Sequence, residues 1–411
     1  MTHLMVRSPW RRLMVIGSLY LVSDIGYSFF FAALGTILLG RGMPLQSVAL
    51  INLLGVIYFG RFLVGPIVDR YGHARFGHYR GWLIGTQLAL ILALLGLAAL
   101  DPVTNLTAVL AVMAAVMVIS AFHDTAVNGL SVRLLGASER GVANGIQVAA
   151  ASVSILLGSG GALLLYAHAG WTVTLIAIAA VFGIPLAVLS FFAEPPAVDS
   201  SLRASLWQAL SGLFRSRRMA AWIVLIVPFL ALGLCLVTAV QPAMLLAAGW
   251  TLERVAFTQY TLATIGGMAA GPITGAAIAR WGRARAIAVI GAFSAVAVAA
   301  LFPLSTGGGD PIADTAAIVA IAMAYSAMLT WIFTIAMDLA HPATAATDFT
   351  VQTSVLGVLR MVVSSAGLAL AAVTGYPLLI GASLALSLAG TAVAVRWARH
   401  HSWHSTQTGQ L

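Results

Sequence analysis

Gly-Pro-Ile-Val-Asp-Arg-Tyr-Gly at residues 65–72 follows an apolar run, and a related stretch, Gly-Pro-Ile-Thr-Gly-Ala-Ala-Ile-Ala-Arg-Trp-Gly, occupies residues 271–282. About half of the 411-residue chain separates the two stretches. The dipeptide Asp-Pro also recurs, at residues 101–102 and 310–311. A repeat of this length indicates that the chain consists of two related halves.

The composition around these stretches predicts a membrane protein. Apolar residues make up 61% of the chain, charged residues only 8%, and the mean hydropathy is +0.99. Soluble proteins carry about 25% charged residues, and a helix that spans a bilayer needs about 20 mostly apolar residues. Runs of that size occupy residues 13–39, 46–68, 81–100, 104–130, 141–167, 171–193, 220–248, 254–279, 284–303, 311–337, 346–374 and 376–397.

These runs predict an all-α membrane protein of about 12 transmembrane helices. We expect an N-terminal six-helix bundle over residues 1–193 and a C-terminal one over 220–411 that ends in a short cytoplasmic tail. The polar stretch 194–219 is the predicted linker. We also expect a monomer in the lipid bilayer.

The charges predict the orientation. The chain has no lysine, and its 21 arginines and 12 acidic residues give a net charge of +9. In the predicted transmembrane topology, only Arg41 and Arg254 fall on the side of the membrane opposite the termini, and Arg360 is counted within an apolar run. The other arginines share the side of both termini and the linker, which the positive-inside rule makes cytoplasmic.

Several functional classes are not expected. Arginines in short loops orient helices rather than bind nucleic acid. The single cysteine, Cys235, excludes disulfides within the chain. We find no Ser-Lys pair, metal-binding helix or phosphate-binding glycine loop, so the sequence predicts no enzyme, cofactor or metal site. His400, His401 and His404 are interpreted as part of an exposed tail.

The stretch 65–72 resembles the signature loop of the major facilitator superfamily. The resemblance implies a carrier that works by alternating access and a conformational latch formed by Gly65, Asp69, Arg70 and Gly72. Asp69 is expected to accept hydrogen bonds from an opposing helix N-terminus or to pair with an arginine. The candidate arginines are Arg133 and Arg140.

A narrower resemblance covers most of the first half. Residues 69–71, 76–83, 87, 120–124 and 139–141 are similar to anhydromuropeptide permeases of the AmpG type, although His123-Asp124 stands where that family usually has Gln-Asp. The compact length and the stretch 342–350 resemble siderophore permeases of the RhtX/FptX type. We therefore predict import of an iron-siderophore complex. The alternatives are a permease for anhydromuropeptides or another amphipathic anionic solute, or an exporter of such a solute.

Ionisable side chains at membrane depth cost about 2.5–3.5 kcal/mol on insertion scales, so each requires an explanation. We predict a proton-coupling site at Asp124, with His123 and Asp24 as further candidates. The alternative role of Asp124 is helix packing against Asn128. Arg360 is predicted to bind a substrate anion, and the alternative is a salt bridge to Asp24 or Asp348.

Polar side chains within the apolar runs are further candidates for substrate binding, against the alternative that they bridge neighbouring helices. They are Tyr27, Gln87, Asn144, Gln147, Gln241 and Gln352. Glycines spaced four residues apart, at 141 and 145 and at 267, 271 and 275, predict close-packed helix faces. Residues 158–161 are either a hinge or a packing site.

Overall fold

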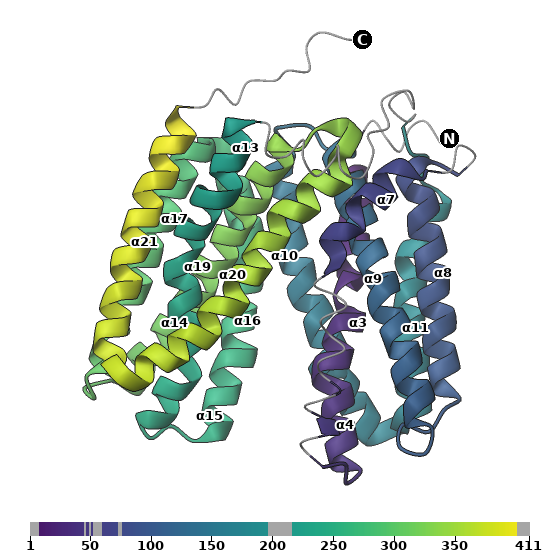
Figure 1. Ribbon diagram of the computed structural model, residues 1–411, viewed down its shortest axis with the longest axis horizontal. Coiled ribbons are helices and arrows are strands. Elements are labelled where there is room, and N and C mark those ends of the chain that lie inside the picture. The colour runs from purple at the N-terminus through teal and green to yellow at the C-terminus, as the bar shows by residue number, and fades with distance from the viewer. Residues whose placement is uncertain are drawn as a thin grey trace. The chain divides into compact units, whose positions relative to one another are not determined.

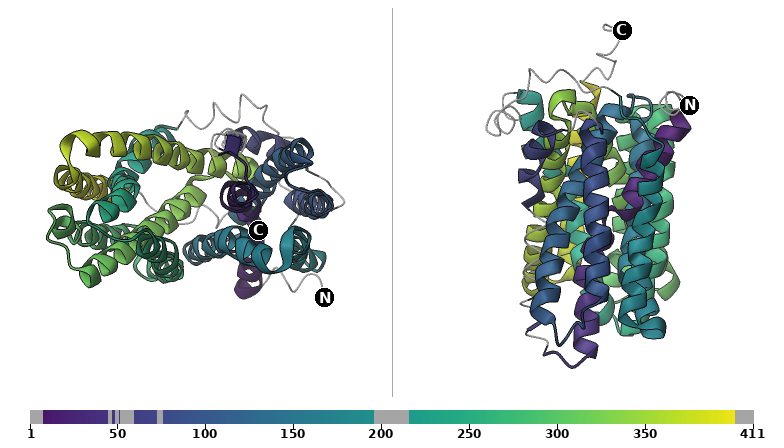
Figure 2. Two further views of the ribbon diagram at one scale, coloured as in Figure 1. Left: turned by 90° about the horizontal axis from the view of Figure 1, so that it is seen from below. Right: turned by 90° about the vertical axis from the view of Figure 1, so that its right-hand side faces the viewer.

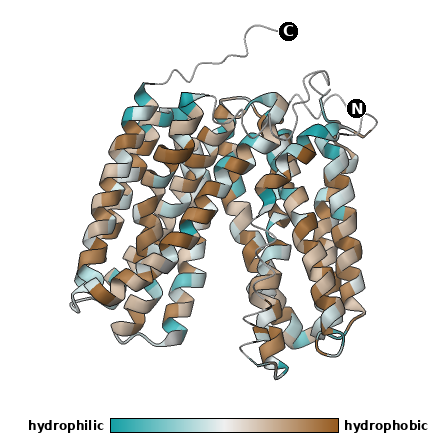
Figure 3. Cartoon of the chain, viewed as in Figure 1, coloured by the Kyte–Doolittle hydropathy of each residue, from teal (hydrophilic) through white to brown (hydrophobic). Residues whose placement is uncertain are grey.

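The computed structural model describes residues 8–44, 47–48, 51, 60–72, 76–195 and 216–400. Within these residues ten helical spans are long and apolar enough to cross a membrane. Hydrophobic residues dominate the middle of the helices, and hydrophilic residues gather toward helix ends and connections (Figure 3). The predicted all-helical membrane fold is therefore confirmed.

Three of the predicted runs do not each correspond to a separate described span. The fifth and sixth lie in one helical stretch, Arg140–Ser190, where Gly170 interrupts the helical backbone with φ 77° and ψ −178°. A positive φ of this size suits glycine, which has no Cβ to clash with the backbone. Residues 46, 49–50 and 52–59 of the predicted run 46–68 lie outside the described residues. The count of 12 helices stays a prediction.

The chain forms two compact units. Unit 1 comprises residues 1–135, 150–212 and 340–351, and unit 2 comprises residues 136–149, 213–339 and 352–411. Each unit thus contains one short segment from the other half of the sequence. The predicted boundary at 194–219 follows the duplication, and most of that linker lies outside the described residues.

Unit 1 is built on long helices that are apolar on most faces. Its elements are α2 (Pro9–Ser23), α3 (Ile25–Ser28), η1 (Phe29–Leu34), α4 (Gly35–Gly40), η3 (Gly60–Leu63), α7 (Gly65–Arg70), α8 (His78–Ala98), α9 (Leu106–Leu134), η4 (Leu157–Gly161), α11 (Ala162–Ser190) and η8 (Pro342–Thr344). Helix α8 packs against α9 and α11, and α2 also contacts both. Phe29, Phe30, Met113, Trp171 and Phe182 are buried in one core cluster of this unit.

Unit 2 contains α13 (Arg217–Ala221), η6 (Trp222–Ile226), α14 (Val227–Ala247), α15 (Leu252–Ala256), η7 (Phe257–Leu262), α16 (Ala263–Trp281), α17 (Arg283–Ala299), α18 (Phe302–Ser305), α19 (Pro311–Leu339) and α21 (Tyr376–Arg399). Yellow α21 runs beside teal α14 and green α17 (Figures 1 and 2). Trp222 packs against Trp331 and Trp397, with ring centroids 5.8 and 5.2 Å apart. Helices α10 (Arg140–Leu156) and α20 (Ala345–Thr374) pass from one unit into the other.

The repeated Asp-Pro dipeptides have the same local structure in both units. Asp101 accepts the backbone N–H of Thr104 and Val103, at 2.9 and 3.0 Å, and these bonds lower the pKa of its carboxyl group. Asp310 likewise accepts two backbone N–H groups at the start of α19. Arg41 reaches Asp101 at 3.6 Å, and Arg254 donates to the Pro311 carbonyl at 3.2 Å. Arg41 and Arg254, the two arginines predicted on the side opposite the termini, therefore contact equivalent loops.

Candidate functional site

Asp124 lies at the centre of a buried polar network in unit 1, hereafter the Asp124 network. Its Oδ2 is 3.0 Å from a guanidinium nitrogen of Arg61, and the Asn128 amide donates to the same oxygen at 3.4 Å. The Tyr20 hydroxyl donates to Asn128 Oδ1 at 2.8 Å. Residues from η3, α9 and α2 thus share one set of contacts. Asp124 has the packing partner that the sequence suggested and also a partly buried arginine.

Arg61 is the residue of this site that sequence reasoning missed. It lies inside the predicted apolar run 46–68, yet it was counted among the loop arginines. An arginine within an apolar run is the same signal that drew attention to Arg360. That signal could have found Arg61 as well.

His123 and Asp124 point to different helices, as their adjacency on α9 predicts. The His123 Nε2 lies 3.2 Å from the Gln87 amide nitrogen on α8, and both side chains are buried. Among the described residues, His123 Nδ1 and Gln87 Oε1 have no hydrogen-bond partner. The structure therefore brings Gln87 to His123, and Arg61 to Asp124.

Asp24 and Tyr27 lie where the first long helix is irregular. Asp24 ends α2 with φ −101° and ψ 1°, and its backbone N–H donates to the Ser154 hydroxyl at 3.0 Å. The Tyr27 ring packs on Phe31, with centroids 4.6 Å apart. A Cβ on Gly158 would collide with the Ile25 carbonyl. This close contact favours packing over a hinge at residues 158–161.

Arg360 lies in unit 2 with its guanidinium 5.6 Å from the centre of the Tyr325 ring. The arginine is exposed, and Tyr325 is half-buried on α19. Arg360 also forms a side-chain hydrogen bond with Tyr325. An arginine beside an aromatic ring can bind a polar group of a ligand that packs on the ring. The arrangement suits an anion that carries an apolar or sugar face.

The candidate amides make helix contacts in this structure. In unit 2, Asn144 donates to the Arg140 carbonyl at 2.7 Å, and Gln352 donates to the Ala336 carbonyl at 3.3 Å. The Gln259 amide lies 3.5 Å from Gln241 Oε1. Gln147 is buried, and its Oε1 has no hydrogen-bond partner among the described residues. Their role in substrate binding stays a prediction.

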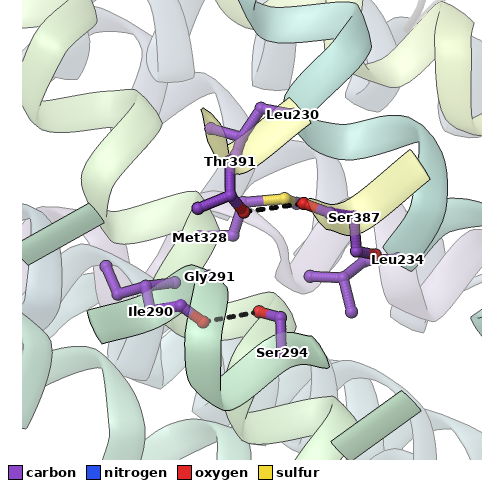
Figure 4. Close-up of a pocket in the computed structure, with 8 residues that line it drawn as sticks. All are labelled: Leu230, Leu234, Ile290, Gly291, Ser294, Met328, Ser387 and Thr391. Carbon is purple, nitrogen blue, oxygen red and sulfur yellow. Dashed lines mark hydrogen bonds between the residues drawn. The ribbon is translucent and has the colours of Figure 1, made fainter. Parts of the chain in front are cut away.

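A small cavity in unit 2 is lined by residues of four helices. They are Leu230, Leu234, Ile290, Gly291, Ser294, Met328, Ser387 and Thr391 (Figure 4). Its volume of about 10 Å³ is close to the minimum for one water molecule. It is far too small for the solutes that the sequence predicts.

Asp69 holds the start of α20, an arrangement we call the Asp69 latch. Its Oδ2 accepts the backbone N–H of Thr347 at 2.8 Å and the Thr347 hydroxyl at 2.6 Å. Its Oδ1 accepts the Ala346 N–H at 3.1 Å and the Tyr79 hydroxyl at 2.7 Å. A Cβ on Gly65 would lie 2.6 Å from Thr347 Cα, so glycine permits this approach. Of the two predicted partners, the helix N-terminus is the one that these bonds engage.

Other residues of the signature loop take different positions. Arg70 is exposed and lies over the Tyr71 ring at 5.6 Å. A Cβ on Gly72 would collide with the His78 ring. Gly72 therefore permits the close approach of His78, whereas Arg70 contacts the Tyr71 ring.

The predicted arginine partners of Asp69 form ion pairs elsewhere. Arg133 pairs with Glu194 at 3.5 Å in unit 1. Arg140 pairs with Asp338 at 3.0 Å in unit 2, and Asp338 also binds Arg283 at 3.0 Å. The prediction failed because side-chain reach between helices is not visible in a single sequence.

Burial affects both carboxylates of unit 1 that lie at these loops. It raises the pKa of Asp69, against the hydrogen bonds from Thr347 and Tyr79 that lower it. It also raises the pKa of Glu194, against the backbone N–H groups of Arg80 and Tyr79 and the charge of Arg133. In each case the hydrogen-bond donors stabilise the charged carboxylate against the cost of its desolvation.

Four glycines bring α10 and α16 into backbone contact in unit 2. A Cβ on Gly145 would lie 2.9 Å from Pro272 Cα, and one on Gly271 would lie 2.7 Å from the Gly145 carbonyl oxygen. One turn away, a Cβ on Gly141 would lie 2.9 Å from the Gly275 carbonyl oxygen. Such contacts are typical of membrane helices that pack through small residues.

Comparison with known proteins identifies the family. Residues 16–372 match the Major Facilitator Superfamily. The chain belongs to this superfamily. It is 30% identical to the anhydromuropeptide permease of Escherichia coli K12 over 189 residues, 45% of this chain and 38% of the relative. It is 24% identical over 257 residues to "Putative transporter AmpG 4" of Rickettsia felis, 60% of this chain and 62% of the relative.

Solved structures of the superfamily share the fold. A bacterial homologue of the iron transporter ferroportin, in an outward-facing state, matches with a TM-score of 0.71 and 16% identity over 96% of this chain and all of the other. The fucose:proton symporter of Escherichia coli matches with a TM-score of 0.66 and 16% identity over the same shares. At this identity the match concerns the fold alone. The chain spans less than two thirds of the length of the curated relatives named above.

Together these findings describe a multi-pass membrane protein of a family of secondary transporters, which are not enzymes. The predicted resemblance to AmpG-type permeases is confirmed. The resemblance to siderophore permeases has no counterpart in these matches and stays a prediction.

Proposed function

We propose that this protein is an inner-membrane permease that imports an amphipathic anionic solute by proton-coupled alternating access, with anhydromuropeptides as the substrate class. The ion pair between the partly buried Arg61 and the buried Asp124 carries the proposal. A buried pair is costly to form from solvated ions, and ionisable groups at membrane depth mark solute and proton pathways. The distribution of arginines supports a cytoplasmic location for both termini.

The polar groups suit the chemistry of a muropeptide, which combines sugar rings, amides and at least one carboxylate. Arg360 and Tyr325 offer a cation beside an aromatic face. Gln241 and Gln259 offer amide groups of the kind that bind sugar hydroxyls or acetamido groups. The name of the Escherichia coli relative supports this class over a ferric siderophore. A ferric siderophore with polar oxygens beside an apolar or aromatic face would suit the same two side chains, so one assay must include both.

The substrate is tested by counterflow into proteoliposomes that contain only the purified protein. We expect labelled disaccharide of N-acetylglucosamine and 1,6-anhydro-N-acetylmuramic acid to exchange, and ferric siderophores neither to exchange nor to compete. Arg360→Gln should raise the half-saturation concentration by roughly tenfold, because a charged hydrogen bond contributes about 1.5–3 kcal/mol. Its abundance in the membrane should be unchanged.

The matched control is Arg280→Gln, an exposed arginine at the end of α16. It should leave the half-saturation concentration at the wild-type value. Exchange of a ferric siderophore without exchange of the disaccharide would overturn the proposed substrate and favour the siderophore prediction. Equal loss of abundance and transport in Arg360→Gln would assign that residue a structural role.

A further inference from the structure

The two partners of the ion pair in the Asp124 network differ in exposure and in the element that carries them. The Asp124 side chain is 9% exposed and lies in the middle of α9, a helix of 29 residues, where Asn128 fixes it one turn away. The Arg61 side chain is 23% exposed and comes from η3, a 3-10 element of four residues. The arginine is therefore the more exposed partner of the pair. Its long side chain can also change partner while the carboxylate stays in place.

The surroundings of Asp124 offer few ways to compensate its charge. Arg61 and the Asn128 amide contact the carboxylate directly. The Tyr20 hydroxyl lies beyond Asn128 and donates to its Oδ1 at 2.8 Å. His123 on the same helix points to Gln87. Among the described residues, Arg61 is the cation that pairs with Asp124.

We infer that Arg61 is a binding site for the carboxylate of the transported anion. When this anion displaces Asp124 from Arg61, Asp124 takes up a proton. This inference rests on the proposed function and deepens it, because it assigns Arg61 to substrate binding and gives the coupling a mechanism. Before binding, the site holds one guanidinium and one carboxylate. After binding, it holds the guanidinium, the ligand carboxylate and a neutral carboxyl group. One proton therefore enters with each carboxylate, and the charge of the site is unchanged.

The buried Asp124 carboxylate is costly to leave without its cation. Removing one partner of a buried ion pair costs about 3–5 kcal/mol, since the other charge stays desolvated and uncompensated. Each 1.4 kcal/mol corresponds to about a tenfold change in an equilibrium constant. A proton on Asp124 removes that penalty. Anion and proton thus bind more tightly together than apart, and this is the condition for coupled transport.

The first test needs no substrate. Difference infrared spectra of the purified protein at neutral pH distinguish a protonated carboxyl group from a carboxylate by its carbonyl stretch. We expect Arg61→Gln to show an additional protonated-carboxyl band that is absent from the wild type and from Arg61→Lys. The double variant Arg61→Gln/Asp124→Asn should lose the band, which assigns it to Asp124. Absence of the band from correctly folded Arg61→Gln would overturn the inference.

The second test uses the anhydro-disaccharide acid, with its neutral methyl amide as the control ligand. Binding of the acid to the wild type should produce the Asp124 band and take up about one proton per ligand, measured by calorimetry in buffers of different ionisation enthalpy. Asp124→Asn should bind the acid without proton uptake, and Arg61→Gln should bind it at least roughly tenfold more weakly. The amide should produce no band.

The outcomes separate the two proposals. If the acid binds without the band and without proton uptake, the inference is wrong while the substrate class stands. If the wild type does not bind the acid at all, the substrate class is wrong, and the infrared spectrum of Arg61→Gln still decides whether the arginine controls the proton on Asp124.

Discussion

Replacing Asp69 with asparagine is expected to lower the rate of transport by roughly tenfold or more, with the protein still inserted in the membrane. The Asp69 carboxylate accepts four hydrogen bonds, three of them from the first residues of α20. Hydrogen bonds to a charged group contribute about 1.5–3 kcal/mol each, and the helix N-terminus adds a favourable dipole. Asparagine keeps one acceptor oxygen but turns an N–H2 group toward the donors of Thr347. Uptake into proteoliposomes measures the loss.

A second readout shows whether the latch itself is lost. Spin labels placed on α7 and α20 in a Cys235→Ser background report the distance between the two segments, because Cys235 is the only cysteine in the chain. We expect a longer distance to become populated in Asp69→Asn. Arg70→Gln is the matched control, since the adjacent Arg70 is exposed over Tyr71. An unchanged distance distribution in Asp69→Asn would contradict the latch.

Replacing Gly145 with leucine is the change with the second large expected effect. Its Cβ would lie 2.8 and 2.9 Å from backbone atoms of Gly271 and Pro272, so one of the two helices must move. Overpacking of a well-packed interior costs about 1–3 kcal/mol, and backbone atoms relax less readily than side chains. We expect transport to be lost and the midpoint of thermal unfolding in detergent to fall.

Gly85→Leu is the control for this substitution. Gly85 lies on α8, is exposed, and a Cβ there meets nothing within 4 Å. Glycine is less favourable than alanine in a helix interior by about 0.8–1 kcal/mol, and leucine ranks close to alanine, so this variant should fold and transport as the wild type does. If Gly145→Leu behaves like Gly85→Leu, the close contact between α10 and α16 is not needed for function.

The sequence predicted features that depend on periodicity along one helix. The apolar runs match most of the observed spans, and the four-residue spacing of glycines identified the faces where α10 and α16 meet. The angle of about 100° between neighbours on a helix anticipated that His123 and Asp124 face different partners. The Asp69 carboxylate at a helix N-terminus was also one of the two stated expectations.

Partners on different helices were harder to predict. Arg133 and Arg140 were expected near Asp69, but they pair with Glu194 and Asp338. The choice among several carboxylates depends on helix rotation and side-chain reach, which a single sequence does not contain. Arg61 was missed for a different reason. Its position inside an apolar run is visible in the sequence. Because most arginines lie on one side of the membrane in the predicted topology, Arg61 was counted with them as a loop residue.

The most direct test of the account is accumulation of the anhydro-disaccharide acid in proteoliposomes under an imposed proton gradient, acidic outside. The wild type is predicted to accumulate the acid above its external concentration, and a protonophore should abolish that accumulation. Asp124→Asn should still exchange the acid but should not accumulate it. Accumulation that survives the protonophore, or that is unchanged in Asp124→Asn, would contradict a proton-coupled carrier with Asp124 as its proton site.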